Sequence, residues 1–175
     1  MIDELEHVIL VDPDDQPLGT ERKIEAHVEG KLHRAFSVLI HDGNGRMLLQ
    51  QRAPEKYHSG GLWTNACCGH PRPGEATIDA ARRRLIEEMG IDCPLVPLHS
   101  LTYRADVGNG LIEHEVVHLF VGHWDGAVAA DPSEVSDYAW KTLNETRAEA
   151  LNDPERFTAW FRVYLDRQDT DWFAA

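Results

Sequence analysis

The sequence contains few cysteines and no long apolar run. Its three cysteines include the adjacent pair Cys67 and Cys68, so a disulfide framework is not expected. No apolar stretch approaches the roughly 20 residues that a membrane-spanning helix requires. The segment from Met1 to Glu6 also lacks the basic and apolar regions of a secretory signal peptide. These absences predict a protein of the reducing cytoplasm that does not enter a membrane.

Basic residues are also scarce. Lysines and arginines number 17 against 30 aspartates and glutamates, which gives a formal net charge of −13. This charge repels nucleic acids and anionic membranes, so neither is expected as a partner. It would repel a phosphorylated small molecule as well, unless bound cations or converging Lys and Arg side chains offset it. With 175 residues, 42% of them hydrophobic, the chain is expected to form a single domain over residues 1–175 and to be a monomer.

The hydrophobic pattern predicts both strands and helices. Strands are expected over residues 8–10, 33–41, 47–52, 101–105, 113–121 and 138–140. The turn residues Asp42 to Gly45 predict that the second and third of these strands form a hairpin. Helical spacing predicts helices over residues 77–89, with Thr77 as N-cap and Gly90 after the end, and over residues 157–165. This mixture predicts an α+β fold.

The segment from Gly69 to Ile91 contains a motif of glycine, glutamate and arginine residues at defined spacings. It reads Gly-x5-Glu-x7-Arg-Arg-Leu-Ile-Glu-Glu-Met-Gly-Ile. This resembles the Nudix box, Gly-x5-Glu-x7-Arg-Glu-U-x-Glu-Glu-x-Gly-U, in which U is a bulky apolar residue. Arg84 stands where the box has a glutamate. The resemblance implies a Nudix-type mixed β-sheet sandwiched between helices, with a loop and helix that handle diphosphates through divalent metal.

A cysteine and histidine motif precedes this segment. It reads Thr64-Asn65-Ala66-Cys67-Cys68-Gly69-His70-Pro71. The motif resembles Thr-Asn-x-x-Cys-Gly-His-Pro of the type I isopentenyl-diphosphate isomerases, and the likeness extends over roughly residues 9–160. The resemblance implies an enzyme that interconverts isopentenyl and dimethylallyl diphosphate by adding a proton to one carbon and removing one from another.

Two glutamates and three histidines are the candidate metal ligands. Glu113 and Glu115 lie two residues apart on a predicted strand, so both carboxylates project from one face. The isomerase resemblance places metal-binding histidines at His27, His33 and His70. Three imidazoles and two carboxylates suit Mn²⁺, Mg²⁺ or Zn²⁺. The remaining histidines are expected to be surface or core residues: His7, His41, His58, His99, His114, His118 and His123.

The resemblance also implies a site for the diphosphate group. Glu88 would hold a Mg²⁺ ion that accompanies the diphosphate. The cations that would contact the diphosphate directly are Lys23, Arg52, Lys56 and Arg84. Because Arg84 replaces a metal-ligand glutamate, it favours phosphate binding over phosphate cleavage. Read without the resemblance, Arg84 and Glu88 are four residues apart on a helix and form an ordinary surface ion pair.

The residues implied in proton transfer are a carboxylate, a phenol and a thiol. Glu115, supported by Tyr103, would protonate the alkene, and Cys68 would remove the allylic proton. Near His70 and a metal, Cys68 is expected to have a pKa that makes the thiolate accessible. Trp160 would lie over the carbocation, with a plain core position as the alternative. Cys67 and Cys93 are expected to be buried apolar residues.

Two other functions are compatible with some of these residues. A Nudix pyrophosphohydrolase of a nucleoside diphosphate derivative would keep the glutamate that Arg84 replaces and would not need Cys68. A non-catalytic protein could use the His and Glu cluster as a structural metal site, and it would lose its fold on chelation. The isomerase is the favoured hypothesis.

Overall fold

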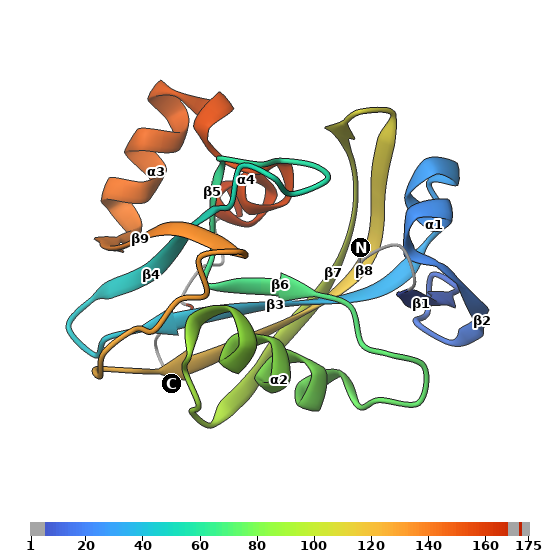
Figure 1. The fold of residues 1–175 in the computed structure, drawn as a ribbon, viewed down its shortest axis with the longest axis horizontal. Helices are drawn as coiled ribbons and strands as arrows, with labels where there is room; N and C mark the ends of the chain where they lie inside the picture. Colours follow the sequence, from blue (N-terminus) through green and yellow to red (C-terminus); the bar gives the residue numbers. More distant parts are fainter. Residues whose placement is uncertain (1–5, 168–171, 173–175) are drawn as a thin grey trace.

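The computed structural model describes residues 6–167 and 172. Among these residues the strands form one mixed sheet of nine strands, with helices packed against it (Figure 1). In chain order the elements are β1 (His7–Val11), β2 (Pro17–Arg22), α1 (Lys23–Glu29), β3 (His33–His41), β4 (Arg46–Arg52), β5 (Trp63–Thr64), β6 (Cys67–Gly69), α2 (Thr77–Met89), β7 (Leu95–Gly108), β8 (Leu111–His123), β9 (Val135–Thr142), α3 (Leu143–Asn152), the short 3₁₀ helix η2 (Pro154–Arg156) and α4 (Ala159–Asp166).

Strand β3 is the central strand of the sheet. It runs parallel to β8 along its whole length, beginning with His33 opposite Glu115. It also pairs antiparallel with β6, where Ser37 lies opposite Cys68. Strands β7 and β8 form a long antiparallel pair, which contains the predicted strands 101–105 and 113–121. These pairings confirm most of the predicted strands and bring the β3, β6 and β8 side chains together.

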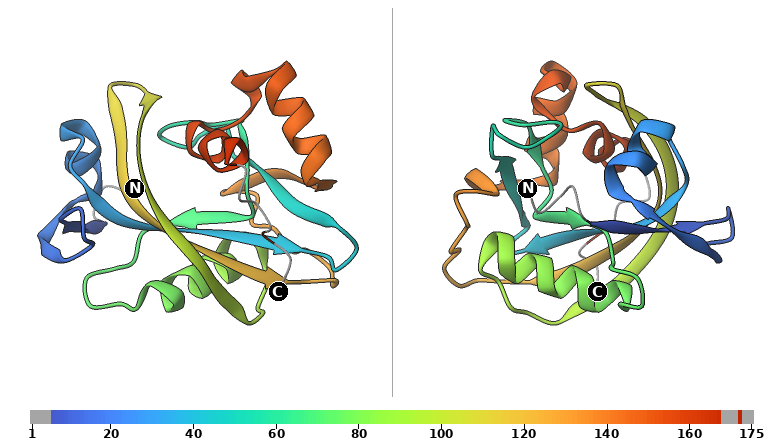
Figure 2. Two further views of the ribbon diagram at one scale, coloured as in Figure 1. Left: turned by 180° about the vertical axis from the view of Figure 1, so that it is seen from behind. Right: turned by 45° about the vertical axis from the view of Figure 1, so that its right-hand side comes forward.

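Alternation along β3 gives the sheet two apolar faces. Phe36 and Val38 pack in the core that contains the buried Leu85 of α2. Leu39 points to the opposite face, where Phe161 and other aromatic residues of α4 complete a second core. Figures 1 and 2 show α2 on one side of the sheet and α3 and α4 on the other. The predicted α+β architecture, a mixed sheet between helices, is therefore confirmed.

The predicted hairpin between residues 33–41 and 47–52 is confirmed at its turn and wrong beyond it. Within these two described strands, the pairing is limited to His41 opposite Met47. Strand β4 then leaves β3 and pairs with β5 and β9. The reason is that β6 pairs with the middle of β3, which a longer hairpin would need.

Helix α2 has the predicted bounds but a different N-cap. It ends at Gly90, whose φ of 66° is the left-handed conformation that glycine adopts readily. Its N-cap is Ala76, which makes no side-chain capping hydrogen bond, so Thr77 is the first helical residue instead of the cap. Strands β2, β5 and β6 and helix α3 have no counterpart in the predictions, because they are short or lack a strong apolar period.

Two features bear on the expected environment of the protein. Across the residues that the structure describes, no helix combines the length and apolarity needed to cross a lipid bilayer. Cys67, Cys68 and Cys93 are all free thiols, as the sequence predicted.

Candidate active site

A cavity lies where α4, the β7–β8 pair and one side of α2 approach one another. It is lined by Glu6, Lys23, Ser37, Arg52, Lys56, Tyr57, His58, Cys68, Gly69, His70, Arg83, Arg84, Glu88, Tyr103, Glu113, Glu115, Trp160 and Tyr164. All predicted site residues except His27 and His33 are among them. Those two lie next to His70, with ring centroids 5.5 Å and 5.0 Å from that of His70. The fold therefore gathers the whole predicted set in one place.

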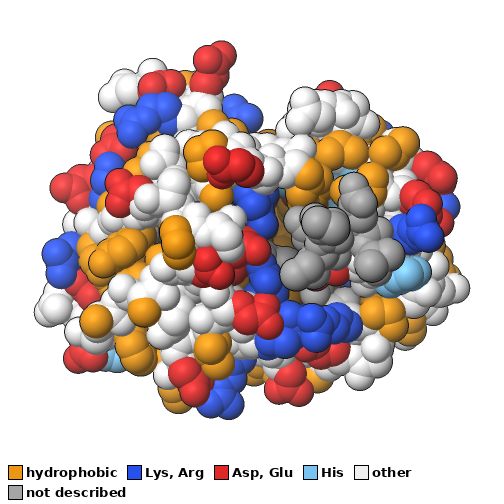
Figure 3. Space-filling model, in the orientation of Figure 1, with side chains coloured by type: hydrophobic (Ala, Val, Ile, Leu, Met, Phe, Trp, Pro, Cys, Tyr) orange, Lys and Arg blue, Asp and Glu red, His pale blue; other side chains and the backbone are white. Residues whose placement is uncertain are grey.

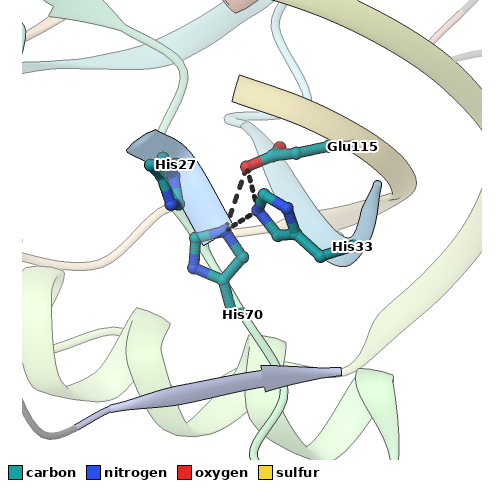
Figure 4. A group of neighbouring side chains, drawn as sticks. All are labelled: His27, His33, His70 and Glu115. Carbon is teal, nitrogen blue, oxygen red and sulfur yellow. Dashed lines mark hydrogen bonds and ion pairs between the residues drawn. The ribbon is translucent and has the colours of Figure 1, made fainter. Parts of the chain in front are cut away.

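Three histidines from separate elements converge on Glu115 (Figure 4). His27 lies on α1, His33 begins β3 and His70 follows β6. Nε2 of His70 is 2.9 Å from Oε1 of Glu115 and 3.2 Å from Nε2 of His33. Each of the four side chains offers one ligand atom, and these atoms lie within 4.8 Å of one another. The arrangement is compact enough to surround a single metal ion.

The tautomers of two of these histidines follow from their backbone contacts. Nδ1 of His27 is 2.7 Å from the carbonyl oxygen of Lys23, and Nδ1 of His33 is 2.8 Å from that of Lys31. Since a carbonyl oxygen can only accept, each Nδ1 carries the proton and each Nε2 presents a lone pair. Nε2 of His27 is buried without a hydrogen-bond partner among the described residues. A divalent cation would satisfy these lone pairs, so the residues fit a metal ion.

Burial keeps His27 and His70 in the neutral form that binds metal. It lowers the pKa of His27 to about 4, and the nearby His33 lowers it further. It also lowers the pKa of His70 to about 3, even though Glu115 acts in the opposite direction. Neutral imidazole is the ligand form, so the site loses little affinity to protons near neutral pH.

The Tyr103 hydroxyl joins the two glutamates of β8. It lies 2.8 Å from Oε2 of Glu113 and 2.7 Å from Oε2 of Glu115. Burial and the charge of Glu115 raise the pKa of Glu113 well above its ordinary value. Burial also opposes ionisation of Glu115, but its contacts with His33 and His70 outweigh burial and hold its pKa well below the ordinary value. The surroundings therefore favour the neutral form of Glu113 and the charged form of Glu115.

His58 belongs to this group, although the sequence placed it among surface or core histidines. Its Nε2 lies 3.4 Å from Oε1 of Glu113, and the residue is 3% exposed. With His27 and Glu113 it forms a second group of ligand atoms within 4.8 Å. His58 lies in the loop between β4 and β5, and no spacing in the sequence relates it to the other ligands. His114, by contrast, contacts the carbonyl oxygen of Gly30 and stays outside the cluster, as predicted.

Positive charge gathers around the cavity. Figure 3 shows Lys and Arg side chains running down the middle of one face of the molecule. The predicted diphosphate-binding residues Lys23, Arg52, Lys56 and Arg84 all line the cavity. Lys56 donates a hydrogen bond to Glu134, whose carboxylate also lies 3.4 Å from Arg84. The carboxylate of Glu134 therefore neutralises part of the positive charge of both residues.

Arg84 and Glu88 form an ion pair that faces the cavity. NH2 of Arg84 lies 2.6 Å from Oε1 of Glu88, whose side chain is 8% exposed. The other carboxylate oxygen of Glu88 accepts a hydrogen bond from Gln50 at 3.0 Å. Burial opposes the charge of Arg84, but Glu88 outweighs it and raises the guanidinium pKa. The ion pair expected on the helix surface is thus present but lies within the site.

The adjacent cysteines point to opposite faces of the sheet. They are successive residues of β6, so their side chains alternate. Cys68 lines the cavity, whereas Cys67 is buried in the core beneath α2. The accessible thiolate expected for Cys68 beside His70 and a metal ion stays a prediction. Burial raises the pKa of Cys68 to about 12, although the hydrogen bond that Ser37 donates to the sulfur lowers it.

Trp160 is a core residue, as the alternative predicted, and it also forms part of the cavity wall. It is 2% exposed and belongs to the core beneath α4, and it also lines the cavity. The guanidinium carbon of Arg52 lies 5.3 Å from its ring centroid, and the ring of His58 meets it edge-on at 5.7 Å. Core packing therefore fixes a ring that remains available to a ligand.

Comparison with known sequences identifies the family. The NUDIX domain model matches residues 31–161. Isopentenyl-diphosphate Delta-isomerase of Pectobacterium atrosepticum is 51% identical over 170 residues, covering 97% of this chain and 95% of the relative. The enzyme of the same name from Burkholderia multivorans is 54% identical over 162 residues, covering 93% and 92%. This chain belongs to the isopentenyl-diphosphate Delta-isomerase family.

Solved structures agree with this assignment at the level of the fold. A crystal structure from Deinococcus radiodurans superposes on the chain with a TM-score of 0.76 at 18% identity, covering 91% of this chain and 97% of the other. A MutT protein from Methanosarcina mazei gives a TM-score of 0.63 at 22% identity, covering 78% and 91%. At these identities the likeness shows the fold alone. The isomerase family therefore shares its Nudix fold with proteins of quite different sequence.

Proposed function

We propose that this member of the isomerase family interconverts isopentenyl and dimethylallyl diphosphate. The observation that carries the proposal is the composition of the cavity. A thiol and a carboxylate suited to proton transfer line the same cavity as the basic residues suited to a diphosphate. A protein that only binds a metal ion would need neither the thiol nor the basic residues beside it.

The basic half of the cavity would anchor the diphosphate. Lys23, Arg52, Lys56 and Arg84 supply charge-assisted hydrogen bonds, which are stronger than neutral ones. Glu88 would hold the Mg²⁺ ion that accompanies the diphosphate, since carboxylate oxygens suit this ion. Anchoring the diphosphate would fix the alkene over the thiol and carboxylate and thereby lower the entropic part of the barrier.

The other half of the cavity would move the protons. An alkene is a feeble base, so the acid must act in a pocket that excludes water. In the direction that forms dimethylallyl diphosphate, a protonated Glu115 would give its proton to one carbon with help from the Tyr103 hydroxyl, and a Cys68 thiolate would take a proton from another. This leaves Glu115 charged and Cys68 as a thiol, the forms that their surroundings favour, and the roles exchange in the reverse direction. Trp160 would face the carbocation with its π electrons.

A divalent ion would complete the acid end of the cavity. His27, His33, His70, Glu113 and Glu115 would hold Mn²⁺, Mg²⁺ or Zn²⁺, and the positive charge would increase the acidity of groups beside it. The residues themselves would keep the carboxylate and phenol aligned. His58 is close enough to Glu113 to steady that carboxylate.

One assay tests the proposal directly. Purified protein with Mg²⁺ and isopentenyl diphosphate should form dimethylallyl diphosphate, which proton NMR distinguishes by its methyl groups. The matched control is the Cys68→Ala variant, which should form none. Release of phosphate from nucleoside diphosphate derivatives, without isomerisation, would instead support the pyrophosphohydrolase, which Arg84 disfavours.

A monomeric state and a cytoplasmic location remain predictions, to be checked by light scattering and cell fractionation.

A further inference from the structure

The Cys68 thiol lies within a chain of buried side-chain hydrogen bonds. Oγ of Ser37 is 3.3 Å from Sγ of Cys68 and 2.9 Å from the hydroxyl of Tyr164. Sγ of Cys68 is 3.2 Å from Oδ1 of Asn65. Ser37 and Tyr164 are each 1% exposed, and Asn65 is fully buried. Water therefore has little access to the side chains that hold the sulfur, although the sulfur itself lines the cavity.

The orientation of Asn65 fixes the donor and acceptor of each hydrogen bond in this series. Its amide nitrogen donates to the carbonyl oxygens of Val38 at 3.0 Å and Cys67 at 2.9 Å. Because carbonyl oxygens only accept, the amide cannot be flipped, and Oδ1 faces the sulfur as an acceptor. The thiol hydrogen of Cys68 therefore points at Asn65.

The directions of the hydroxyl hydrogens of Ser37 and Tyr164 follow from that of the thiol hydrogen. Since the thiol hydrogen is directed to Asn65, sulfur receives the hydroxyl hydrogen of Ser37. The oxygen of Ser37 is then free to accept the hydroxyl hydrogen of Tyr164. Hydrogen-bond donation therefore has a single direction: Tyr164 donates to Ser37, Ser37 donates to Cys68, and Cys68 donates to Asn65.

The geometry points to Ser37 as a positioning residue for the Cys68 sulfur, held in its donor orientation by Tyr164. This inference rests on the proposed role of Cys68 as the residue that exchanges a proton with substrate carbon. A thiol and a thiolate can both accept from Ser37, so the hydroxyl need not turn when the sulfur gains or loses its proton. Such a preorganised donor keeps the sulfur aimed throughout the reaction.

Strand pairing gives Ser37 a fixed position as well. Ser37 lies opposite Cys68 in the antiparallel β3–β6 register, so backbone pairing holds the two residues side by side. Tyr164 is held by edge-on packing against Tyr103, with ring centroids 6.3 Å apart. The positioning group is therefore rigid on both sides, as a precise proton-transfer site requires.

Infrared spectroscopy and kinetics of Ser37 variants test the inference. The Cys67→Ala/Cys93→Ala background leaves Cys68 as the one thiol of the sequence, so its S–H stretching band can be observed alone. Ser37→Ala should shift this band to higher frequency, because a hydrogen bond accepted by sulfur strengthens the one that the thiol donates. It should lower kcat by about 10-fold to 100-fold, as expected for a misplaced group, with KM changed less than about 3-fold.

Three further variants separate positioning from general damage. Ser37→Thr keeps the hydroxyl and should restore both the band and most of kcat. Tyr164→Phe should shift the band in the same direction by a smaller amount. Ser100→Ala, which removes an exposed hydroxyl from β7 outside the cavity, should change neither.

The inference is overturned if the Cys68 band is the same in Ser37→Ala as in its parent, or if Ser37→Ala retains the parental kcat. It is also overturned if Ser37→Ala changes KM alone. The band needs no substrate, so it reports the contact independently. Absence of isomerisation in the parent protein would instead count against the proposed function.

Discussion

The Tyr103 hydroxyl contacts Glu113 and Glu115 at nearly equal distances, 2.8 Å and 2.7 Å. A hydroxyl has one hydrogen, so it can donate to one carboxyl at a time. The other carboxyl must supply a hydrogen of its own. The raised pKa of Glu113 and the lowered pKa of Glu115 assign that hydrogen to Glu113. Without metal, the pair therefore shares one proton.

Metal binding should release that proton. A cation bound to both carboxylates stabilises the charged form of Glu113. Adding the ion to metal-free protein near pH 7 should therefore release close to one proton per ion. Calorimetric titration with Mn²⁺ in two buffers of different ionisation enthalpy measures this number. Glu113→Gln should bind the ion more weakly and release no such proton. Equal proton release from both proteins would reject the assignment.

The two adjacent cysteines should respond differently to substitution. Cys68→Ala should abolish isomerisation, because it removes the thiol that lines the cavity. Cys67→Ala should retain most activity, because Cys67 packs in the opposite core. Circular dichroism would verify that both variants fold. An equal loss of activity from both, with folds intact, would contradict the role of Cys68.

Glu115→Gln should reduce turnover strongly. The amide keeps the size of the side chain but cannot carry the proton, and a positioned acid or base typically contributes 10²-fold to 10⁴-fold. Measuring kcat after metal content has been equalised separates proton transfer from metal loss. Turnover close to that of the unmodified protein would assign the proton donor elsewhere, with Tyr103 as the next candidate.

Arg84→Ala should act mainly on KM. Loss of a charged hydrogen-bond donor to the diphosphate should cost about 1.5–3 kcal/mol of binding. Arg84→Glu should be worse, because it places a like charge beside the substrate. Steady-state kinetics on both variants measure the effect. If Arg84 serves only as the helix partner of Glu88, KM would stay unchanged and stability would fall slightly.

The metal-free protein should lose stability as the pH falls below 6.5. Burial, aided by the charge of Arg52, lowers the pKa of His58 from 6.5 to about 2. The unfolded chain therefore binds a proton at His58 in this range while the folded protein does not, and the free energy of unfolding falls. Between pH 7.5 and 5.5 this one residue should contribute about 1.4 kcal/mol to the fall. Urea unfolding of the protein and of His58→Gln at both pH values measures the difference, and an identical fall in the two would contradict it.

The sequence by itself determined the longer local elements and pointed to the residue types that the site brings together. The apolar period fixed α2 and the strand β3 because such patterns report which face of an element is buried. The two-residue spacing of Glu113 and Glu115 placed both carboxylates on one face of β8. The cysteine and histidine motif was specific enough to indicate the family, and the comparisons agree.

Tertiary structure alone decided which distant residues meet and in what protonation state. The register of β3 against β8 places His33 beside Glu115, and that of β7 places Tyr103 there. No local pattern encodes these pairings, because they join residues that lie far apart in the sequence. Folding also brings His58 beside Glu113 and buries Cys68, and that burial raises the pKa of the Cys68 thiol. The cost of placing a charge away from water depends on all surrounding atoms, so it exists only once the chain has folded.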